Sequence, residues 1–181
     1  MKRLSAAIAA MCLIVVCGVA TGQDKIAKQD AKAMRDLAQA NIAEIETGKL
    51  AARKAQSAEV KKFGQQMADD HGKMLSELKQ LASSKGVKLP EKAGAKERAE
   101  MQKLEALSAD RFDRSYMSHM VKDHQNDVKE TDKIARNAKD PDLKAAVEQA
   151  NAKIKEHLQM AEQVAGTVGA DSKAGAGTSS R

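Results

Sequence analysis

Four polar side chains in this 181-residue sequence have the residue types and the spacing of metal ligands. Three are histidines, His71, His124 and His157, and each interrupts a run of apolar residues that follows the three-four spacing of a helix. The fourth is Glu44, which lies in the segment before His71. Neutral imidazole nitrogens and one carboxylate suit Zn, Fe, Cu or Mn, because the carboxylate lowers the cost of burying a dication. The sequence therefore predicts a transition-metal site held by these four residues.

A second interpretation gives the histidines no metal. An imidazole in a helical core is often a buried polar group that hydrogen-bonds to a neighbour. The three histidines would then form a polar layer. The protein would be a structural or stress-related envelope protein that binds an unknown partner or a cell-wall polymer through its charged faces. The residues alone leave both interpretations open.

Acidic residues lie next to two of the histidines. Asp70 and Asp123 each precede a histidine by one position, so they point about 100° away from it around the helix. This direction predicts that they orient groups on adjacent helices and do not bind the same ion. Asp127, three residues after His124, is predicted to hydrogen-bond to a ligand or to act as an added ligand. His119 is predicted to pair with Asp123, four residues further on.

The segments that must position these side chains are predicted to be four long helices and one short helix. The apolar spacing and the capping residues predict helices over 29–55, 58–85, 95–107, 109–138 and 141–165, with N-caps at Ser57, at Ser108 or Asp110, and at Asp140. Two tight connections, near Gln56 and Asp140, join the long helices in pairs, and a longer connection over 86–107 separates the pairs. This pattern predicts an all-α fold, a ferritin-like four-helix bundle with a short extra helix in its central connection. A single long coiled coil fits less well, because the helix stops are strong and closely spaced.

The depth of each candidate ligand along its helix predicts that the four residues meet. Glu44 and His71 lie at similar distances along the chain on either side of the first tight turn, near Gln56. His124 and His157 lie at similar distances on either side of the second turn, near Lys139. At about 1.5 Å of rise per residue, the two members of each pair are level to within roughly 4.5 Å. One candidate ligand from each long helix is therefore expected near the middle of the bundle.

The composition excludes several classes of protein. Only Phe63, Phe112 and Tyr116 are aromatic, which argues against a sheet protein, and 42% hydrophobic residues argue against a disordered chain. Without Lys2 and Arg3, the 29 remaining basic residues exceed the 25 acidic ones by four. The two signs are interspersed along the chain, whereas a nucleic-acid surface needs a stripe of one sign with stacking aromatic residues between the charges, so no nucleic-acid partner is expected.

The N-terminus has the features of a secretory signal peptide. Two basic residues precede an apolar run over 6–20, and Ala20-Thr21-Gly22 provides the small residues for cleavage before Gln23. About 15 apolar residues are too few for a membrane anchor, which needs about 20. We therefore predict a signal peptide at 1–22 and a periplasmic or secreted protein that does not span a membrane after cleavage.

The cysteines and the C-terminus complete the predicted division of the chain. A lipoprotein anchored through Cys17 is an alternative to simple export, but Val16 is larger than the residue usually found before a lipidated cysteine. Cys12 and Cys17 both lie in the signal peptide, so the mature chain has no disulfide and no thiolate ligand. Residues 23–28 are predicted to be a linker, 29–165 the bundle domain, and the Gly-, Ala- and Ser-rich residues 166–181 a disordered tail.

Several motifs together resemble those of a known family. They are residues 43–51 (AEIETGKLA), 59–71 (from EVKKF to DH), 85–90 (KGVKLP), 112–124 (from FDRSY to MVKDH), 140–143 (DPDL) and 156–158 (EHL). These motifs resemble the bacterial exported proteins grouped as domain of unknown function 4142, over roughly residues 29–164. The resemblance implies a ferritin-like bundle without an established activity.

The residues do not support the chemistry of the di-iron bundles. Those proteins use Glu-x-x-His motifs, whereas Ala68, Val121 and Ile154 stand three residues before the three histidines. The sequence also supplies no base, nucleophile or substrate pocket from which a reaction could be argued. Whether the protein is an enzyme stays open, and the residues favour a protein that is not one.

Overall fold

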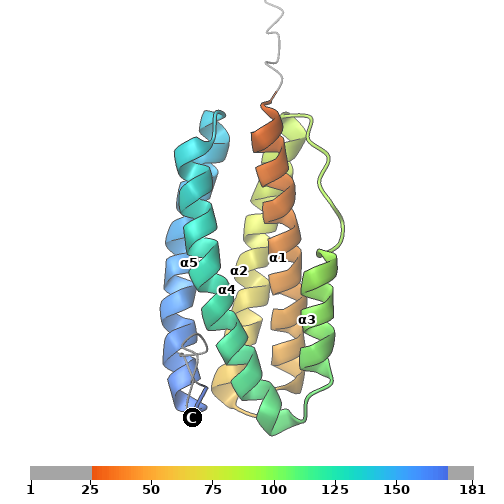
Figure 1. The fold of residues 1–181 in the computed structure, drawn as a ribbon, viewed down its shortest axis with the longest axis vertical. Helices are drawn as coiled ribbons and strands as arrows, with labels where there is room; N and C mark the ends of the chain where they lie inside the picture. Colours follow the sequence, from red (N-terminus) through yellow and green to blue (C-terminus); the bar gives the residue numbers. More distant parts are fainter. Residues whose placement is uncertain (1–25, 171–181) are drawn as a thin grey trace, which may run out of the picture.

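Five helices make up the part of the chain that the computed structural model describes, residues 26–170 (Figure 1). They are α1 (Lys28–Lys54), α2 (Ala58–Ser84), α3 (Ala95–Glu105), α4 (Ala109–Asn137) and α5 (Pro141–Thr167). Their ends agree with the predicted ends to within two residues. None of these helices has the length and apolar composition needed to cross a membrane. The predicted signal peptide at 1–22, residues 23–25 of the predicted linker and residues 171–181 of the predicted tail lie outside the described residues. The tail is predicted to begin at residue 166, but α5 continues to Thr167.

Two helical hairpins lie side by side and form the bundle. Helices α1 and α2 pack closely along their length, as do α4 and α5, whereas contacts between the two hairpins are sparser. The central connection runs along the bundle from the end of α2, and the short α3 lies beside α1 (Figure 1). The fold is thus the four-helix bundle with an extra helix that the sequence predicts.

The predicted helix starts at Ser57 and Asp140 are confirmed. The Ser57 hydroxyl accepts a hydrogen bond from the backbone N–H of Val60, and the Asp140 carboxylate accepts hydrogen bonds from the N–H groups of Asp142 and Leu143. Pro141 occupies the first position of α5, where its missing N–H costs nothing. These local signals define the residue at which each hairpin turn ends and the next helix begins. They therefore set how far along α2 and α5 the histidines lie.

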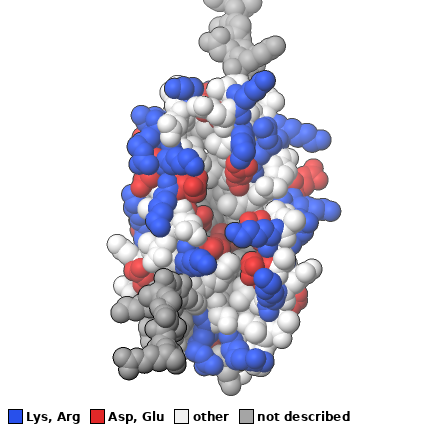
Figure 2. All heavy atoms as spheres, viewed as in Figure 1, with Lys and Arg blue, Asp and Glu red and all other residues white. Residues whose placement is uncertain are grey.

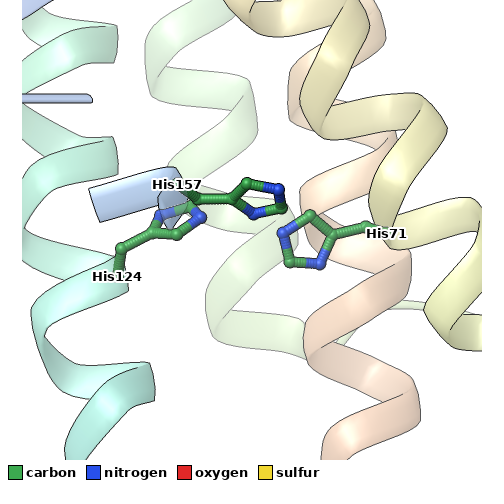
Figure 3. A group of neighbouring side chains, drawn as sticks. All are labelled: His71, His124 and His157. Atoms are coloured by element: carbon green, nitrogen blue, oxygen red, sulfur yellow. The ribbon is translucent and has the colours of Figure 1, made fainter. Parts of the chain in front are cut away.

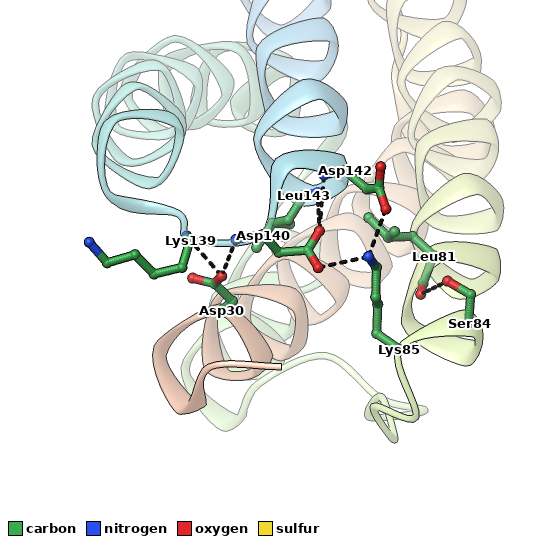
Figure 4. A network of polar contacts seen from close by, with 8 residues as sticks. All are labelled: Asp30, Leu81, Ser84, Lys85, Lys139, Asp140, Asp142 and Leu143. Carbon is green, nitrogen blue, oxygen red and sulfur yellow. Dashed lines mark hydrogen bonds and ion pairs between the residues drawn. The ribbon is translucent and has the colours of Figure 1, made fainter. Parts of the chain in front are cut away.

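Each hairpin turn is held by an aspartate from the other hairpin. Asp113 on α4 accepts hydrogen bonds from the backbone N–H groups of Gln56 (3.1 Å) and Ser57 (2.7 Å) in the α1–α2 turn. Asp30 on α1 accepts them from Lys139 (2.9 Å) and Asp140 (2.7 Å) in the α4–α5 turn (Figure 4). Both aspartates are buried. Because buried N–H groups need partners, these reciprocal bonds fix the depth at which the two hairpins dock.

The end of α2 is joined to the start of α5 by a lysine. Lys85 Nζ lies 2.7 Å from a carboxylate oxygen of Asp140 and 2.6 Å from one of Asp142 (Figure 4). The side chain of Lys85 is only 21% exposed. This pair of contacts ties the hairpins together at the same end as the Asp30 bonds, so that end of the bundle is held by several charge-assisted hydrogen bonds.

Two apolar clusters fill the bundle on either side of its middle. One contains the aromatic rings, with Tyr116 at 6.2 Å from Phe63 and 5.7 Å from Phe112 between centroids. The other is aliphatic and includes Met34, Leu78, Leu143 and Val147. The positions of the histidines along α2, α4 and α5 fall between these two clusters. The polar layer is therefore sealed by apolar packing at both ends.

The buried face of α1 differs from the predicted one. The three-four spacing predicts that six residues face the core: Met34, Leu37, Asn41, Ile45, Gly48 and Ala52. Met34 and Gly48 are buried, but the other four are only half-buried, and Ala38 and Ala51 are buried as well. Helix α1 packs mainly on α2 and makes fewer contacts with α3 and α4, so one stripe does not describe its buried residues.

Two glycines let α1 and α2 approach closely. A Cβ atom added to Gly48 would lie 2.6 Å from the carbonyl oxygen of Gly64, and one added to Gly64 would lie 2.7 Å from both Ala51 Cβ and the Gly48 carbonyl oxygen. Contacts this short involve backbone atoms that cannot move independently. The hairpin therefore requires glycine at both positions.

We expect Gly64→Ala to lower the free energy of unfolding by about 1–3 kcal/mol, the usual cost of overpacking. Gly72→Ala, on the same helix, is the matched control, because its added Cβ meets nothing within 4 Å. That control should raise stability by roughly 0.5–1 kcal/mol, since alanine favours the helix over glycine. Urea unfolding followed by circular dichroism measures both. Equal stability of the two variants would contradict the close-approach argument.

Candidate metal centre

Three histidines from three helices converge in the middle of the bundle. His71 comes from α2, His124 from α4 and His157 from α5 (Figure 3). Their ring centroids are 5.2 to 5.8 Å apart. One ligand-capable nitrogen from each lies within 4.8 Å of the others. All three side chains are buried. The predicted meeting of these histidines is therefore present in the structure.

One nitrogen of each imidazole ring is hydrogen-bonded to a residue outside the group of three histidines. The contacts are His71 Nδ1 to Asn41 Oδ1 at 3.1 Å, His124 Nδ1 to the Met120 carbonyl oxygen at 3.0 Å, and His157 Nε2 to Asp70 Oδ2 at 3.1 Å. Each partner atom is an oxygen that accepts, so each of these ring nitrogens carries the proton and donates. The tautomer of every ring is thus fixed by its neighbour, as is usual for histidines that bind metals.

The other nitrogen of each ring has no protein partner. His71 Nε2, His124 Nε2 and His157 Nδ1 are buried and make no hydrogen bond within residues 26–170. Given the assigned tautomers, all three present lone pairs and none can donate to another. Leaving buried acceptors unpaired costs free energy. A cation bound between the three rings would satisfy all three lone pairs.

Burial keeps the imidazoles neutral. It is the main cause that lowers the pKa of His71 well below its usual value, and the charges of the other two histidines lower it further. Burial followed by the charge of His157 lowers the pKa of His124 to about 4, although its bond to Met120 opposes the shift. Burial also lowers the pKa of His157, against the opposing effect of Asp70. At neutral pH the three rings are therefore unprotonated at the nitrogens that metals bind.

Glu44 does not belong to the group of three histidines. It is buried on α1 and lines a separate small cavity of about 60 Å³ together with His119 and Asp123. Burial is the main cause that raises its pKa well above the usual value, and the negative charges of Asp127 and Asp123 add to the shift. The distance of Glu44 from the first hairpin turn places it at about the same depth in the bundle as the histidines. Depth along a helix does not determine the direction in which a side chain points.

The three aspartates near the site have different surroundings. Asp70 contacts His157 on an adjacent helix, which is the kind of contact its position predicts. Asp123 instead pairs with His119 on its own helix, with 3.0 Å between Nε2 and the carboxylate. Asp127 is only partly exposed and lines a cavity that also reaches His71. Burial, followed by the charge of Asp123, raises the pKa of Asp127 to about 7.

A larger cavity reaches one of the three histidines, His71. It has a volume of about 350 Å³ and lies between the hairpins. Its polar lining includes His71, Asn41 and Asp127, and its apolar lining includes Leu37 and Ile154. Figure 2 shows acidic side chains along the hollow between the hairpins on this face. The lining also contains basic residues, Lys32 and Lys133, so an ion could reach His71 from solvent past side chains of both signs.

Sequence reasoning missed two groups that orient the histidines. Asn41 stands on the apolar stripe of α1, and an amide in such a stripe is a signal that a buried polar partner is needed. The Met120 carbonyl oxygen gives no signal in the sequence, because a backbone acceptor is present at every position. The geometry of α4 alone places it one turn before His124.

The fold and the site together define a class: a four-helix bundle with a buried cluster of three neutral histidines between its hairpins. Residues 17–164 match the family described as "Domain of unknown function (DUF4142)", and the chain belongs to this family. The predicted family is therefore confirmed. No curated protein matches the chain.

One solved structure has a similar fold. It is "CopM in the Cu(II)-bound form", with a TM-score of 0.62 over 76% of this chain and 96% of that chain. The two sequences are 16% identical, so the likeness concerns the fold alone.

Proposed function

We propose that this protein binds one transition-metal ion through His71, His124 and His157, and that copper is the preferred ion. The observation that carries the proposal is the set of three buried ring nitrogens without partners, each on a ring whose other nitrogen is hydrogen-bonded. The similar fold of CopM, solved with Cu(II), supports the choice of copper. The affinity order of divalent ions for nitrogen ligands also places Cu²⁺ above Zn²⁺, Fe²⁺ and Mn²⁺.

The charges around the histidines favour a bound cation over a site that holds no ion. Asp70 compensates positive charge through its hydrogen bond to His157, and Asp127 adds negative charge at the cavity that reaches His71. Three imidazoles leave a coordination position for water or an exchanging ligand, which suits uptake and release of the ion. We place this activity in an exported, ferritin-like protein that holds or carries the metal without turnover, in agreement with the signal-peptide features of residues 1–22.

Metal content tests the proposal. The protein is purified from the periplasm without a His-tag, analysed for transition metals, and then titrated with Cu²⁺ and Zn²⁺ after chelation. We expect one equivalent of copper per chain and tighter binding of Cu²⁺ than of Zn²⁺. Less than about a tenth of an equivalent, together with no binding on titration, would overturn the proposal.

We expect Asp70→Asn to weaken copper binding by about 10- to 100-fold, the usual effect of losing a carboxylate that orients a metal-binding histidine. Asn removes the negative charge but keeps the size of the side chain. Asp69→Asn is the matched control, since Asp69 is exposed and bonds only to Gln65 in the described residues. Competition titration against a copper chelator measures both variants. The same affinity for both would show that Asp70 has no such role.

A further inference from the structure

Apolar packing closes the histidine group along the axis of the bundle. The cluster that contains Phe63 and Tyr116 lies on one side of the group, and the cluster that contains Met34 and Leu143 lies on the other. Buried side chains pack as densely as organic crystals and leave few voids larger than a water molecule. An ion that binds the three histidines therefore has to enter between two helices, from the side of the bundle.

Two cavities between the hairpins differ in how far they reach. One has a volume of about 240 Å³, is lined by α1, α2 and α5, and reaches Asn41 and Asp70 but none of the three histidines. The other, of about 350 Å³, has most of its lining on α1 and α4, and His71 forms part of its wall. A water molecule takes up about 30 Å³ in the liquid, so this second cavity has room for a hydrated ion. Of the two, the larger cavity is the one that leads to a histidine.

One charged side chain in the wall of the larger cavity has no partner of opposite sign. The wall contains two lysines and three acidic residues. Lys32 is paired with Asp36, and Lys133 Nζ lies 3.4 Å from Glu130 Oε2. Asp127 forms no ion pair with any lysine or arginine in residues 26–170. Each of the two pairs has no net charge, so the net charge of the wall is the negative charge of Asp127.

We propose that the ion enters through the cavity between α1 and α4, and that Asp127 attracts it there and raises its rate of binding. This route rests on the proposed function, because it leads to the copper site of the three histidines. A negative charge in a cavity with low-dielectric walls raises the local concentration of cations and their association rate. Although burial raises the pKa of Asp127 to about 7, an approaching cation favours its charged form. Asp127 is then a residue of the entry route and not a ligand of the bound ion.

Stopped-flow mixing of the metal-free full chain with Cu²⁺ measures the association rate, and competition titration measures the dissociation constant. We expect Asp127→Asn to lower the association rate about threefold or more at low ionic strength and to keep the dissociation constant within about twofold of the wild type. The difference in rate should shrink in about 1 M sodium nitrate, where the screening length is about 3 Å. Asp69→Asn is the matched control, because Asp69 is exposed on α2 and is not part of the cavity wall.

Narrowing the cavity tests the route without a change of charge. Ala40 lines the larger cavity, whereas Ala146 lines the smaller one. We expect Ala40→Phe to slow the association and the dissociation of Cu²⁺ by the same factor, so that the dissociation constant does not change. Ala146→Phe should alter neither rate. Circular dichroism verifies the fold of every variant.

The outcomes separate the route from the binding site. Association of Cu²⁺ at the wild-type rate in Asp127→Asn, or in Ala40→Phe, would overturn the route while the proposed function stands. A loss of affinity of about tenfold or more in Asp127→Asn through faster dissociation would make Asp127 a ligand and would also overturn its role in entry. If the wild type bound no copper, the proposed function would fail and the route with it.

Discussion

Replacing His71 with glutamine is expected to weaken Cu²⁺ binding by more than about a hundredfold, beyond the 10- to 100-fold typical of losing an outer hydrogen-bond partner. His71 supplies one of the three buried nitrogens without a protein partner. Glutamine retains a hydrogen-bonding amide toward Asn41 but has no imidazole nitrogen. His124→Gln and His157→Gln should have effects of the same size, because each removes one of three equivalent donors.

The fourth histidine of the described residues provides a matched control for these variants. His119 is only 24% exposed, but it pairs with Asp123 and lies outside the group of three. His119→Gln should therefore leave copper affinity unchanged within about twofold, which is under about 0.5 kcal/mol. Isothermal titration calorimetry with a competing chelator measures all four variants. If His119→Gln weakened binding as much as His71→Gln, the proposed ligand set would be wrong.

The stability of the metal-free protein is expected to fall in acid because of the same histidines. Burial lowers the pKa of His124 from 6.5 to about 4 in the folded state. Since the unfolded chain binds this proton more readily, the stabilising contribution is complete above pH 6.5 and is lost as the pH falls toward 4. The loss from His124 alone is on the order of 3 kcal/mol.

Two buried carboxyl groups change the stability with pH in the opposite direction, so the effect of His124 must be measured as a difference between two proteins. The raised pKa values of Glu44 and Asp127 work in the other direction, because the stability that these groups contribute is lost as the pH rises, toward about 7 for Asp127. Urea unfolding of the wild type and of His124→Gln at several values between pH 7 and pH 4 separates the two effects. We expect the wild type to lose stability relative to the variant over this range. A constant difference between the two proteins would contradict a buried neutral His124.

The helices could be predicted from the sequence because their signals are local. The stop at Gly86 and the start at Asp140-Pro141 depend on backbone conformation and capping within a few residues. The depth of the three histidines in the bundle could be predicted for the same reason. Once the turns are known, the number of residues between a turn and a histidine, multiplied by the helix rise per residue, gives that depth. Spacing within each helix then determines that His71, His124 and His157 share the side that faces the core.

The rest of the site depends on how helices rotate against each other. Gly48 and Gly64 let α1 approach α2 closely, and the rotation of α1 about its own axis places Glu44 in the small cavity with His119 and Asp123, outside the histidine group. The sequence pattern of α1 gives no sign of this rotation, because α1 contacts three other helices. The roles of Asp30 and Asp113 are hidden in the same way. An aspartate near a helix start is favourable next to the helix dipole, and nothing local shows that it binds a distant turn.

The hairpin architecture gives a physical reason for a metal at this position. His71 belongs to the first hairpin, whereas His124 and His157 belong to the second. The two hairpins contact each other less than their own helices do. An ion bound by all three histidines would link the hairpins, and its binding energy would add to the stability of the folded state.

The most direct test of the metal centre is the X-ray absorption spectrum of the copper-loaded chain at the copper edge. Our account predicts nitrogen ligands at about 2.0 Å, the usual distance from a metal to imidazole, with the outer scattering of three imidazole rings. The His71→Gln, His124→Gln double variant should lack this pattern. A wild-type spectrum with no imidazole scattering, or with sulfur as the main ligand, would contradict the central claim that the three histidines hold the ion.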